Sequence, residues 1–314
     1  MAGPTLLAPA GSLDAVHAAL DAGADAVYVG LEGWSRGGSR RELSWDEIVT
    51  SHREASAAGR SLRVALNTIP KPRERARLFE KIPALLEVGI RDVIVNDIGI
   101  LATLERQFPG LRLTASIGCG ARTAADVAFL RDLGAHAVVL PGTVSSAEMR
   151  EIRCVRGISV EVMVHMVEEF VLLGKCWMPS YVNLRPSPLP DESPRRNADA
   201  GGSPEGGSRQ TGSMKRGGVG ACFRICQQPW DLHAGGRRVD SRLLPGRQIS
   251  RIAEVTAYAE SGVDVLKLQG RSLPLDVLVP LVRSYREALD ARTDPTAHEL
   301  PPAALPAMWT VVGR

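Results

Sequence analysis

Short apolar runs typical of buried strands alternate along this sequence with amphipathic runs typical of helices. The pattern predicts strands at 5–9, 26–30, 61–67, 92–97, 111–117, 137–140, 158–165 and 263–269. It predicts helices capped by Ser12 and by Ser44, and further helices over 73–86, 98–107, 123–133, 145–152, 248–262 and 275–291. Strand-then-helix alternation with eight strands predicts an α/β fold of the TIM-like barrel type, with a doubly wound open sheet as the alternative.

One stretch interrupts this alternation. Residues 165–247 contain three of the five cysteines, and within them residues 186–218 are rich in Gly, Pro, Ser and Arg and almost free of apolar side chains. Such a composition predicts disorder. Residues 231–244 predict a small hairpin that turns at Gly235 and Gly236. We therefore expect one barrel over 1–292, which includes the cysteine loop, and a C-terminal tail over 293–314.

The composition is that of a globular protein, with 44% hydrophobic and 23% charged residues. A formal net charge of +3 permits nucleic-acid binding without indicating it. No apolar run reaches the length of a membrane span, and no basic region precedes an apolar one at the N-terminus. We expect a cytoplasmic protein. An odd number of cysteines without an export signal argues against a disulfide framework.

The cysteines give the strongest chemical signal. Cys176 stands in GKCWMPSY, and Cys222 and Cys226 form a C-x3-C pair in GACFRICQQPW. Thiolates gathered in a reducing compartment hold zinc or an iron–sulfur cluster more often than they form a disulfide. The alternative is that Cys222 and Cys226 are ordinary small residues in a turn. The cysteine loop leaves the seventh predicted strand at its carboxyl end, where the active sites of such barrels lie.

Other candidate site residues also lie at the carboxyl ends of strands. Glu161 and His165 are four residues apart on one predicted strand, so both are expected to face the barrel mouth. Glu161 is a candidate general acid or base, or a residue that fixes a loop backbone. Arg271 can bind a substrate carboxylate with two parallel hydrogen bonds. Asn67 and Asp97 are expected to line the same pocket.

No phosphate-binding loop, HExxH pair or nucleophile elbow occurs in the sequence, so a conventional protease is not indicated.

Several stretches together resemble the collagenase-like U-thirty-two peptidase family. They are LLAPAGSLDAVHAALDAGADAVYVG at 6–30, VEVMVH at 160–165, GKCWMPSYV, GACFRICQQPW and VDVLKLQGRS. The resemblance implies a [4Fe–4S] cluster and oxygen-independent hydroxylation, with a prephenate-like oxygen donor. Members resembling the UbiU and UbiV pair act in ubiquinone biosynthesis, and others hydroxylate transfer or ribosomal RNA. The short single barrel is closer in form to the ubiquinone pair.

The resemblance implies that Cys176, Cys222 and Cys226 are cluster ligands. The chain departs from the family pattern elsewhere: Glu169 stands where a first cysteine is common, Trp34 stands near another ligand position, and Gln269 replaces a glutamate. The fourth ligand is then Cys119, which follows the fifth predicted strand, or Glu169, or an exogenous group. Zinc is the alternative metal, and Cys154 is expected to be structural.

The sequence thus predicts an iron–sulfur protein that hydroxylates a small aromatic or quinone-precursor molecule, with Glu161 and Arg271 in the catalytic site. The alternatives are an RNA-base hydroxylase, a peptidase, and a non-catalytic partner subunit that forms a heterodimer with a related barrel.

Overall fold

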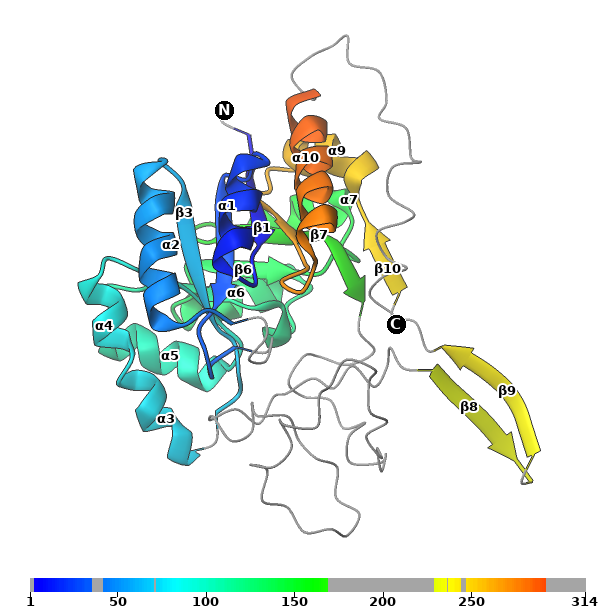
Figure 1. Cartoon of the computed structure of the whole chain (residues 1–314), viewed down its shortest axis with the longest axis horizontal. Coiled ribbons are helices and arrows are strands. Elements are labelled where there is room, and N and C mark those ends of the chain that lie inside the picture. Colours follow the sequence, from blue (N-terminus) through cyan, green and yellow to red (C-terminus); the bar gives the residue numbers. More distant parts are fainter. Residues whose placement is uncertain are drawn as a thin grey trace.

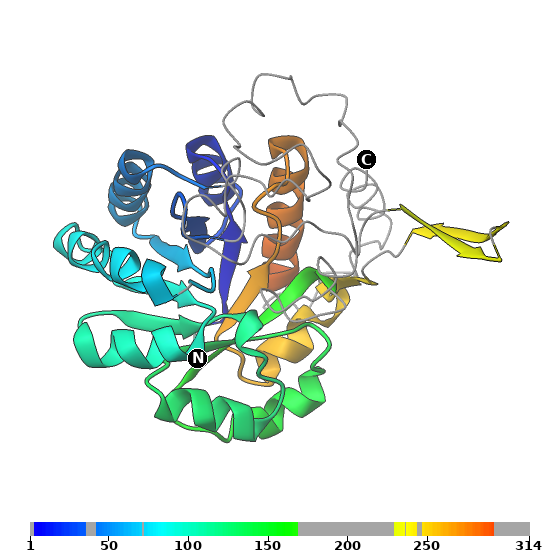
Figure 2. The same cartoon turned by 90° about the horizontal axis from the view of Figure 1, so that it is seen from below.

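Eight parallel strands form a closed barrel in the computed structural model, which describes residues 3–35, 42–70, 72–168, 229–235, 237–243 and 247–291 (Figures 1 and 2). The barrel strands are β1 (Thr5–Pro9), β2 (Ala26–Gly30), β3 (Ser61–Leu66), β4 (Asp92–Val95), β5 (Arg112–Ala115), β6 (Ala137–Leu140), β7 (Ser159–Glu168) and β11 (Val265–Leu268). Each pairs with the next in this order, and β11 pairs with β1 to close the ring. The predicted TIM-like barrel is confirmed.

The helices surround the barrel and mostly begin where the sequence predicts. They are α1 (Leu13–Asp21), α2 (Trp45–Ala57), α3 (Pro72–Phe79), α4 (Ile82–Glu87), α5 (Ile98–Gln107), α6 (Ala124–Asp132), α7 (Ser146–Ile152), α9 (Val255–Glu260) and α10 (Leu275–Ala291), with short 3-10 turns η1 (Ile117–Cys119) and η4 (Ile252–Glu254). The Ser12 side chain accepts a hydrogen bond from the Ala15 amide, and Ser44 and Glu47 form a reciprocal capping box. These caps explain why the predicted starts are correct.

The single helix predicted over 73–86 is wrong. The structure has two helices, α3 and α4, which are separated after Phe79. Pro83 lies in the first turn of α4, where its missing N–H needs no partner. Inside one continuous helix the same proline would remove a hydrogen bond to the carbonyl of Phe79, so the break is placed before it.

The helix predicted over 248–262 is also wrong in its first part. Residues there form strand β10 (Arg247–Ser250), which pairs antiparallel with β7, and only η4 and α9 follow as helical turns. The predicted hairpin is confirmed as β8 (Pro229–Ala234) and β9 (Arg237–Leu243). It stands apart from the barrel in Figures 1 and 2.

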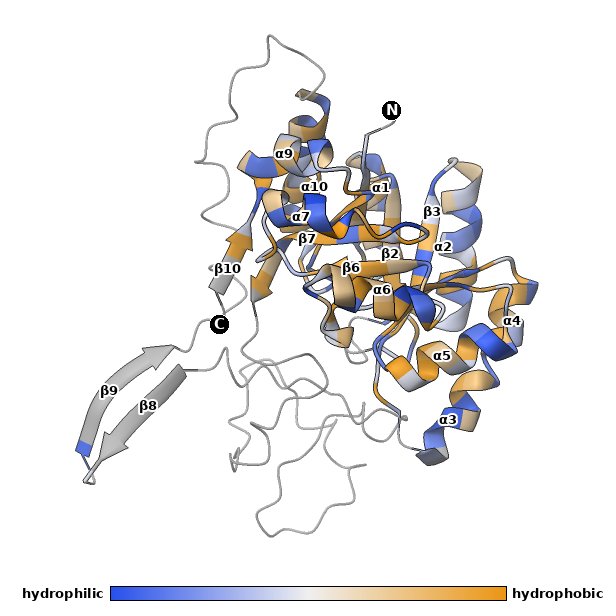
Figure 3. Cartoon of the chain, turned by 180° about the vertical axis from the view of Figure 1, so that it is seen from behind, coloured by the Kyte–Doolittle hydropathy of each residue, from blue (hydrophilic) through white to orange (hydrophobic). Residues whose placement is uncertain are grey.

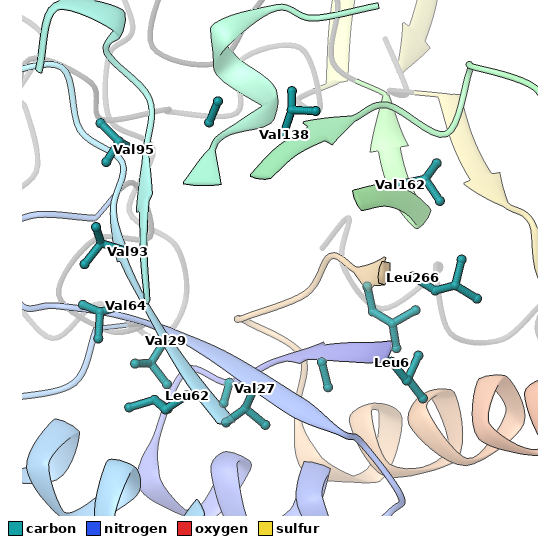
Figure 4. Close-up of a cluster of buried hydrophobic side chains, with 14 of the residues drawn as sticks. Leu6, Val27, Val29, Leu62, Val64, Val93, Val95, Val138, Val162 and Leu266 are labelled. Atoms are coloured by element: carbon teal, nitrogen blue, oxygen red, sulfur yellow. The ribbon is translucent and has the colours of Figure 1, made fainter. Parts of the chain in front are cut away.

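Outward-facing strand residues pack against the helices and form the main hydrophobic core. Figure 4 shows Leu6, Val27, Leu62, Val93 and Val162 in this position. Figure 3 shows hydrophobic colour along the barrel strands and mixed colour on the helices, as expected for helices with one buried face. The main core therefore lies between barrel and helices, and a smaller apolar cluster lies inside the barrel, made of Leu7, Ala26, Tyr28, Ala65, Ile94 and Val265.

Candidate functional site

The cysteine loop begins and ends at one point on the barrel rim. Strand β7 ends at Glu168, and β10 returns beside it, with Arg247 opposite Glu168 and Ser250 opposite His165. This pairing lies at the carboxyl ends of the barrel strands, so the base of the loop is where barrel enzymes place their active sites. Cys176, Cys222, Cys226, Glu169, the insertion 186–218 and the tail 293–314 lie outside the described residues.

Cys119 lies at the same rim, in η1 directly after β5. It is half-buried, and its thiol is 3.5 Å from the Val95 carbonyl oxygen and 3.6 Å from that of Asn96. Ile117 packs against a buried cluster formed by Val139, Met163, Met166 and Ile249, and the last two of these are paired residues of β7 and β10 at the base of the cysteine loop. Its role as fourth ligand stays a prediction.

The exposed Cys154 lies just after α7. Within the described parts of the chain, no group of three or more His, Cys, Asp or Glu side chains is placed to hold a metal ion.

A charged cluster occupies the middle of the barrel. The strand registers place Leu7, Arg63, Thr114 and Glu161 in one inward-facing layer, and Tyr28, Ile94, Val139 and Lys267 in the next layer toward the carboxyl ends. Barrel interiors are usually filled by branched apolar side chains. Here Glu161 is fully buried, and each of its oxygens accepts from a different cation, Arg63 across the barrel and Lys267 at 3.0 Å.

The two cations keep Glu161 ionised. Burial alone would raise the pKa of this carboxyl group, but the charges of Lys267 and Arg63 outweigh burial and lower it. The pKa of Lys267 is also lowered, because burial and the neighbouring Arg63 together outweigh the attraction of Glu161. The two lowered pKa values are what we expect when one carboxylate is shared by two cations. A carboxylate held in this way is a poor general acid. The structure therefore favours a role for Glu161 in positioning the side chains of Arg63 and Lys267.

The expectation that His165 faces the barrel mouth with Glu161 is wrong. The register of β7 against β11 shifts between Lys267 and Leu268, which shows a bulge next to His165. His165 is 98% buried and packs edge-on against Tyr285 of α10, with ring centroids 5.7 Å apart. Met166 instead belongs to the same buried cluster as the inward-facing Met163 and Val139. The bulge therefore turns His165 toward the outer helix layer.

Arg271 is held at the rim after β11. Its Nη1 donates to the Ser35 hydroxyl at 2.7 Å, and Ser35 is fully buried. The Glu42 carboxylate accepts from the backbone amides of Gly33 and Ser35 and so fixes the loop that carries this serine. A Cβ on Gly30 would lie 2.1 Å from Arg271 Nη1, so only glycine leaves room for the guanidinium here. The prediction that Arg271 lies at the carboxyl-end rim is confirmed.

The structure also describes four other residues that the sequence analysis named. Asp97 caps α5 by accepting from the Ile100 amide, and Asn67 follows β3 in a half-buried position. Trp34 is 6% exposed and belongs to the main core. Gln269 Oε1 accepts from the Val167 amide at 2.6 Å and so supports the end of β7. The side-chain amide of Gln269 therefore stabilises the end of β7, where the cysteine loop begins.

Sequence reasoning missed Arg63, Lys267 and Ser35. For Arg63 and Lys267, the available signal was a charged residue inside an otherwise apolar strand, as in SLRVAL and VLKL. Such a residue lies either at an exposed sheet edge or inside a barrel. The sequence alone does not distinguish the two, because the answer depends on whether the sheet closes into a ring.

The profile of the family described as "Peptidase family U32" matches residues 11–311. Among curated proteins, the chain is 26% identical over 310 residues to tRNA hydroxylation protein P of Escherichia coli, covering 91% of this chain and 68% of the relative. It is 27% identical over 292 residues to a 23S rRNA 5-hydroxycytidine synthase of Escherichia coli, covering 91% of this chain and 39% of the relative. It is 22% identical over 311 residues to a collagenase of Porphyromonas gingivalis, with 94% and 67% covered.

A solved structure of a U32 peptidase superposes with a TM-score of 0.46 at 15% identity, covering 53% of this chain and 71% of that chain. The chain spans only 63% of the length of the tRNA hydroxylation protein P1 of Bacillus subtilis and 39% of the rRNA synthase, so the activities of these whole proteins do not transfer to it directly. In the parts of the chain that the structure describes, no helix combines the length and the apolar character needed to cross a membrane.

Proposed function

Because the chain belongs to peptidase family U32, whose profile matches residues 11–311, we propose that it hydroxylates an aromatic ring, and that the ring is a pyrimidine base of RNA. The observation that carries this proposal is the similarity over 91% of the chain to relatives named for tRNA and rRNA hydroxylation. The quinone-precursor ring favoured by the sequence alone is the second candidate, since the single barrel suits it and the net charge of +3 is low for an RNA-binding protein.

The proposed chemistry needs a redox centre, and the position of the loop's two ends supports the cysteine loop as its source. Its two ends meet at the carboxyl-end rim, where Glu168 pairs with Arg247. We propose that Cys176, Cys222 and Cys226 hold a [4Fe–4S] cluster there, with one coordination position left for another ligand. When bound, such a cluster would supply electron transfer for hydroxylation without dioxygen.

In this proposal, Arg271 positions the oxygen donor, Glu161 positions the interior cations, and neither residue holds the cluster. Arg271, held by Ser35 over Gly30, orients an anionic group of the oxygen donor, since a guanidinium binds carboxylates with two parallel hydrogen bonds. Glu161 stays ionised and holds Arg63 and Lys267 in place below.

The test compares cells with and without the gene. Nucleosides from total RNA are separated and weighed by mass spectrometry, and quinones are extracted from cells grown without oxygen. We expect one hydroxylated pyrimidine to disappear on deletion, to return with the wild-type gene and with Cys154→Ala, and to stay absent with Cys176→Ala. Loss of a quinone with unchanged RNA would replace the RNA substrate by the second candidate, and no change in either would reject hydroxylation.

The cluster is tested on the protein itself. Anaerobic purification followed by iron, sulfide and zinc analysis should give iron and sulfide in the wild-type protein and in Cys154→Ala, and little in Cys222→Ala. Zinc in place of iron would reject the redox proposal.

A further inference from the structure

Among the described side chains that point into the barrel, positive charges outnumber negative ones. Arg63 and Lys267 share the single carboxylate of Glu161. The next carboxylate on an inward-facing position, Asp92, forms its own ion pair with Arg112 at the opposite end of the barrel. The Asp92–Arg112 pair is balanced by itself, so the excess of one positive charge lies at Arg63 and Lys267, which share Glu161.

This excess charge is shielded from water. The side chains of Glu161, Lys267 and Arg63 are 0%, 5% and 14% exposed. A buried charge without a counter-charge is destabilising, because the lost hydration is not replaced. Lys267 also lies 4.9 Å from the centre of the Tyr28 ring, whose face attracts a cation without neutralising it. A structure that keeps two cations here therefore favours the arrival of a second anion.

We propose that the barrel binds an anionic oxygen group of a small molecule, a carboxylate or a phosphate, between Arg63 and Lys267. Both side chains already meet Glu161, so their donors are held in place before the anion arrives. The guanidinium matches two oxygens of the incoming group, and the ammonium adds a point charge.

The anion would approach from the carboxyl ends of the strands. The inward-facing layer on that side of the cluster consists of Pro9, Ala65, Ser116 and Met163, as the strand registers show. None of these side chains is charged, and three are small, so this layer offers no competing counter-ion. Arg271 lies beyond it at the rim. A molecule with two anionic groups would contact Arg271 with one and the interior cations with the other.

This inference rests on the proposed function in one respect: the bound anion is taken to be part of a molecule that reacts at this site. Binding itself needs neither the cluster nor RNA, so the two proposals fail separately. The experiment is a thermal-shift titration of the full chain with sodium malonate and, in a second arm, with sodium phosphate. Sodium chloride at equal ionic strength corrects for screening.

A saturable rise in melting temperature is expected for at least one anion, because a ligand that binds only the folded state stabilises it. Lys267→Met and Arg63→Gln should each weaken the apparent affinity roughly tenfold or more, as expected for the loss of a charge-assisted hydrogen bond. Arg112→Gln, which removes a guanidinium that is 63% exposed at the other end of the barrel, should leave the affinity unchanged.

The variant Glu161→Gln should change the apparent anion affinity in the opposite direction. It keeps the test decisive if the Arg63 or Lys267 variant does not fold. It removes the competing carboxylate with little change in shape, so anion affinity should rise several-fold. The inference is overturned if the wild-type protein shows no saturable response to either anion, if all variants respond equally, or if Glu161→Gln binds more weakly than wild type. A response to malonate alone identifies a carboxylate, and a response to phosphate alone identifies a phosphate.

Discussion

His165 is a buried histidine that stays neutral in the folded protein. Burial lowers its pKa from 6.5 to about 3. The Tyr285 hydroxyl donates to the Val164 carbonyl at 2.9 Å and lies 3.4 Å from the His165 ring. The unfolded chain therefore takes up a proton below pH 6.5 that the folded chain takes up only near pH 3. Stability is complete above about pH 6.5 and is lost as the pH falls toward 3.

The expected loss from His165 between pH 7 and pH 5 is about 2 kcal/mol, at 1.4 kcal/mol for each pH unit of unequal protonation. Urea unfolding at the two pH values measures it. His165→Gln should reduce the difference, and a smaller slope should remain from His52, whose pKa burial also lowers. The control Phe129→Ala removes an exposed side chain that carries no titratable group and should keep the wild-type slope. Equal slopes in all three proteins would contradict the assignment.

Gly30 is needed for the position of Arg271. Its Cβ would lie 2.1 Å from Arg271 Nη1 and 2.2 Å from the Ser35 hydroxyl. Gly30→Ala should therefore lower the free energy of unfolding by about 1–3 kcal/mol, the usual effect of overpacking. Urea midpoints measure the change. In an Arg271→Ala background the same substitution should have a smaller effect, and an undiminished effect would show that Arg271 is not the obstacle.

The site could be predicted from the sequence only as far as side-chain type and strand position allow. Arg271 and Glu161 were found because each stands out from an apolar strand or follows one. Arg63 and Lys267 have the same property, but their meeting at Glu161 depends on ring closure, which joins strands about a hundred residues apart. His165 was misplaced because a bulge changes the two-residue alternation on which the prediction depended.

At the scale of elements, one device recurs at the amino ends of three barrel strands. Asp25, His136 and Asp264 each stand just before a strand and accept from a backbone amide of the neighbouring strand, at 2.8, 3.3 and 2.7 Å. Their own amides donate back to the same neighbouring strand. The device fixes the register of one strand against the next and helps to keep the ring closed.

Asp25 is the most connected member. It accepts from the Leu6 amide, from Arg60 at 2.9 Å and from Arg286 at 3.2 Å. Asp25→Ala should lower the free energy of unfolding by about 1–3 kcal/mol, because a largely buried amide loses its acceptor. Asp132→Ala, which removes an exposed carboxylate paired with its neighbour Arg131, should change it by less than about 0.5 kcal/mol. Denaturant unfolding of both variants measures the contrast, and similar values would contradict the role of the device.

Element types were predictable where local signals agree with the tertiary structure. Capping residues placed α1 and α2 because the cap is a local interaction. Strand β10 was misread because Ile249, Ile252 and Val255 have helical spacing. Its backbone pairs with β7, an element about eighty residues earlier, and that pairing decides the conformation.

At the scale of the whole molecule, the strands of the described residues complete the pairing of the barrel. Strand β7 pairs with β6 and β11 on its two sides, and β10 adds to its end outside the ring. The first and last paired residues around the loop, Glu168 and Arg247, are direct partners. A short turn can join such partners. The loop is thus an addition to a complete scaffold, as expected of a segment that carries function.

Replacing residues 170–245 by a short Gly-Asn turn should therefore leave a folded barrel. We expect a monodisperse protein with barrel-like circular dichroism and a cooperative thermal transition, since the main core and the interior charge cluster lie outside the deleted segment. The same variant should bind no iron after anaerobic purification, whereas the full chain should. Aggregation or loss of the transition would show that the loop stabilises the barrel, and iron retained at the full-chain level would exclude Cys176, Cys222 and Cys226 as ligands. The two readouts separate scaffold from chemistry, because the first depends on strand pairing and the second on thiolates.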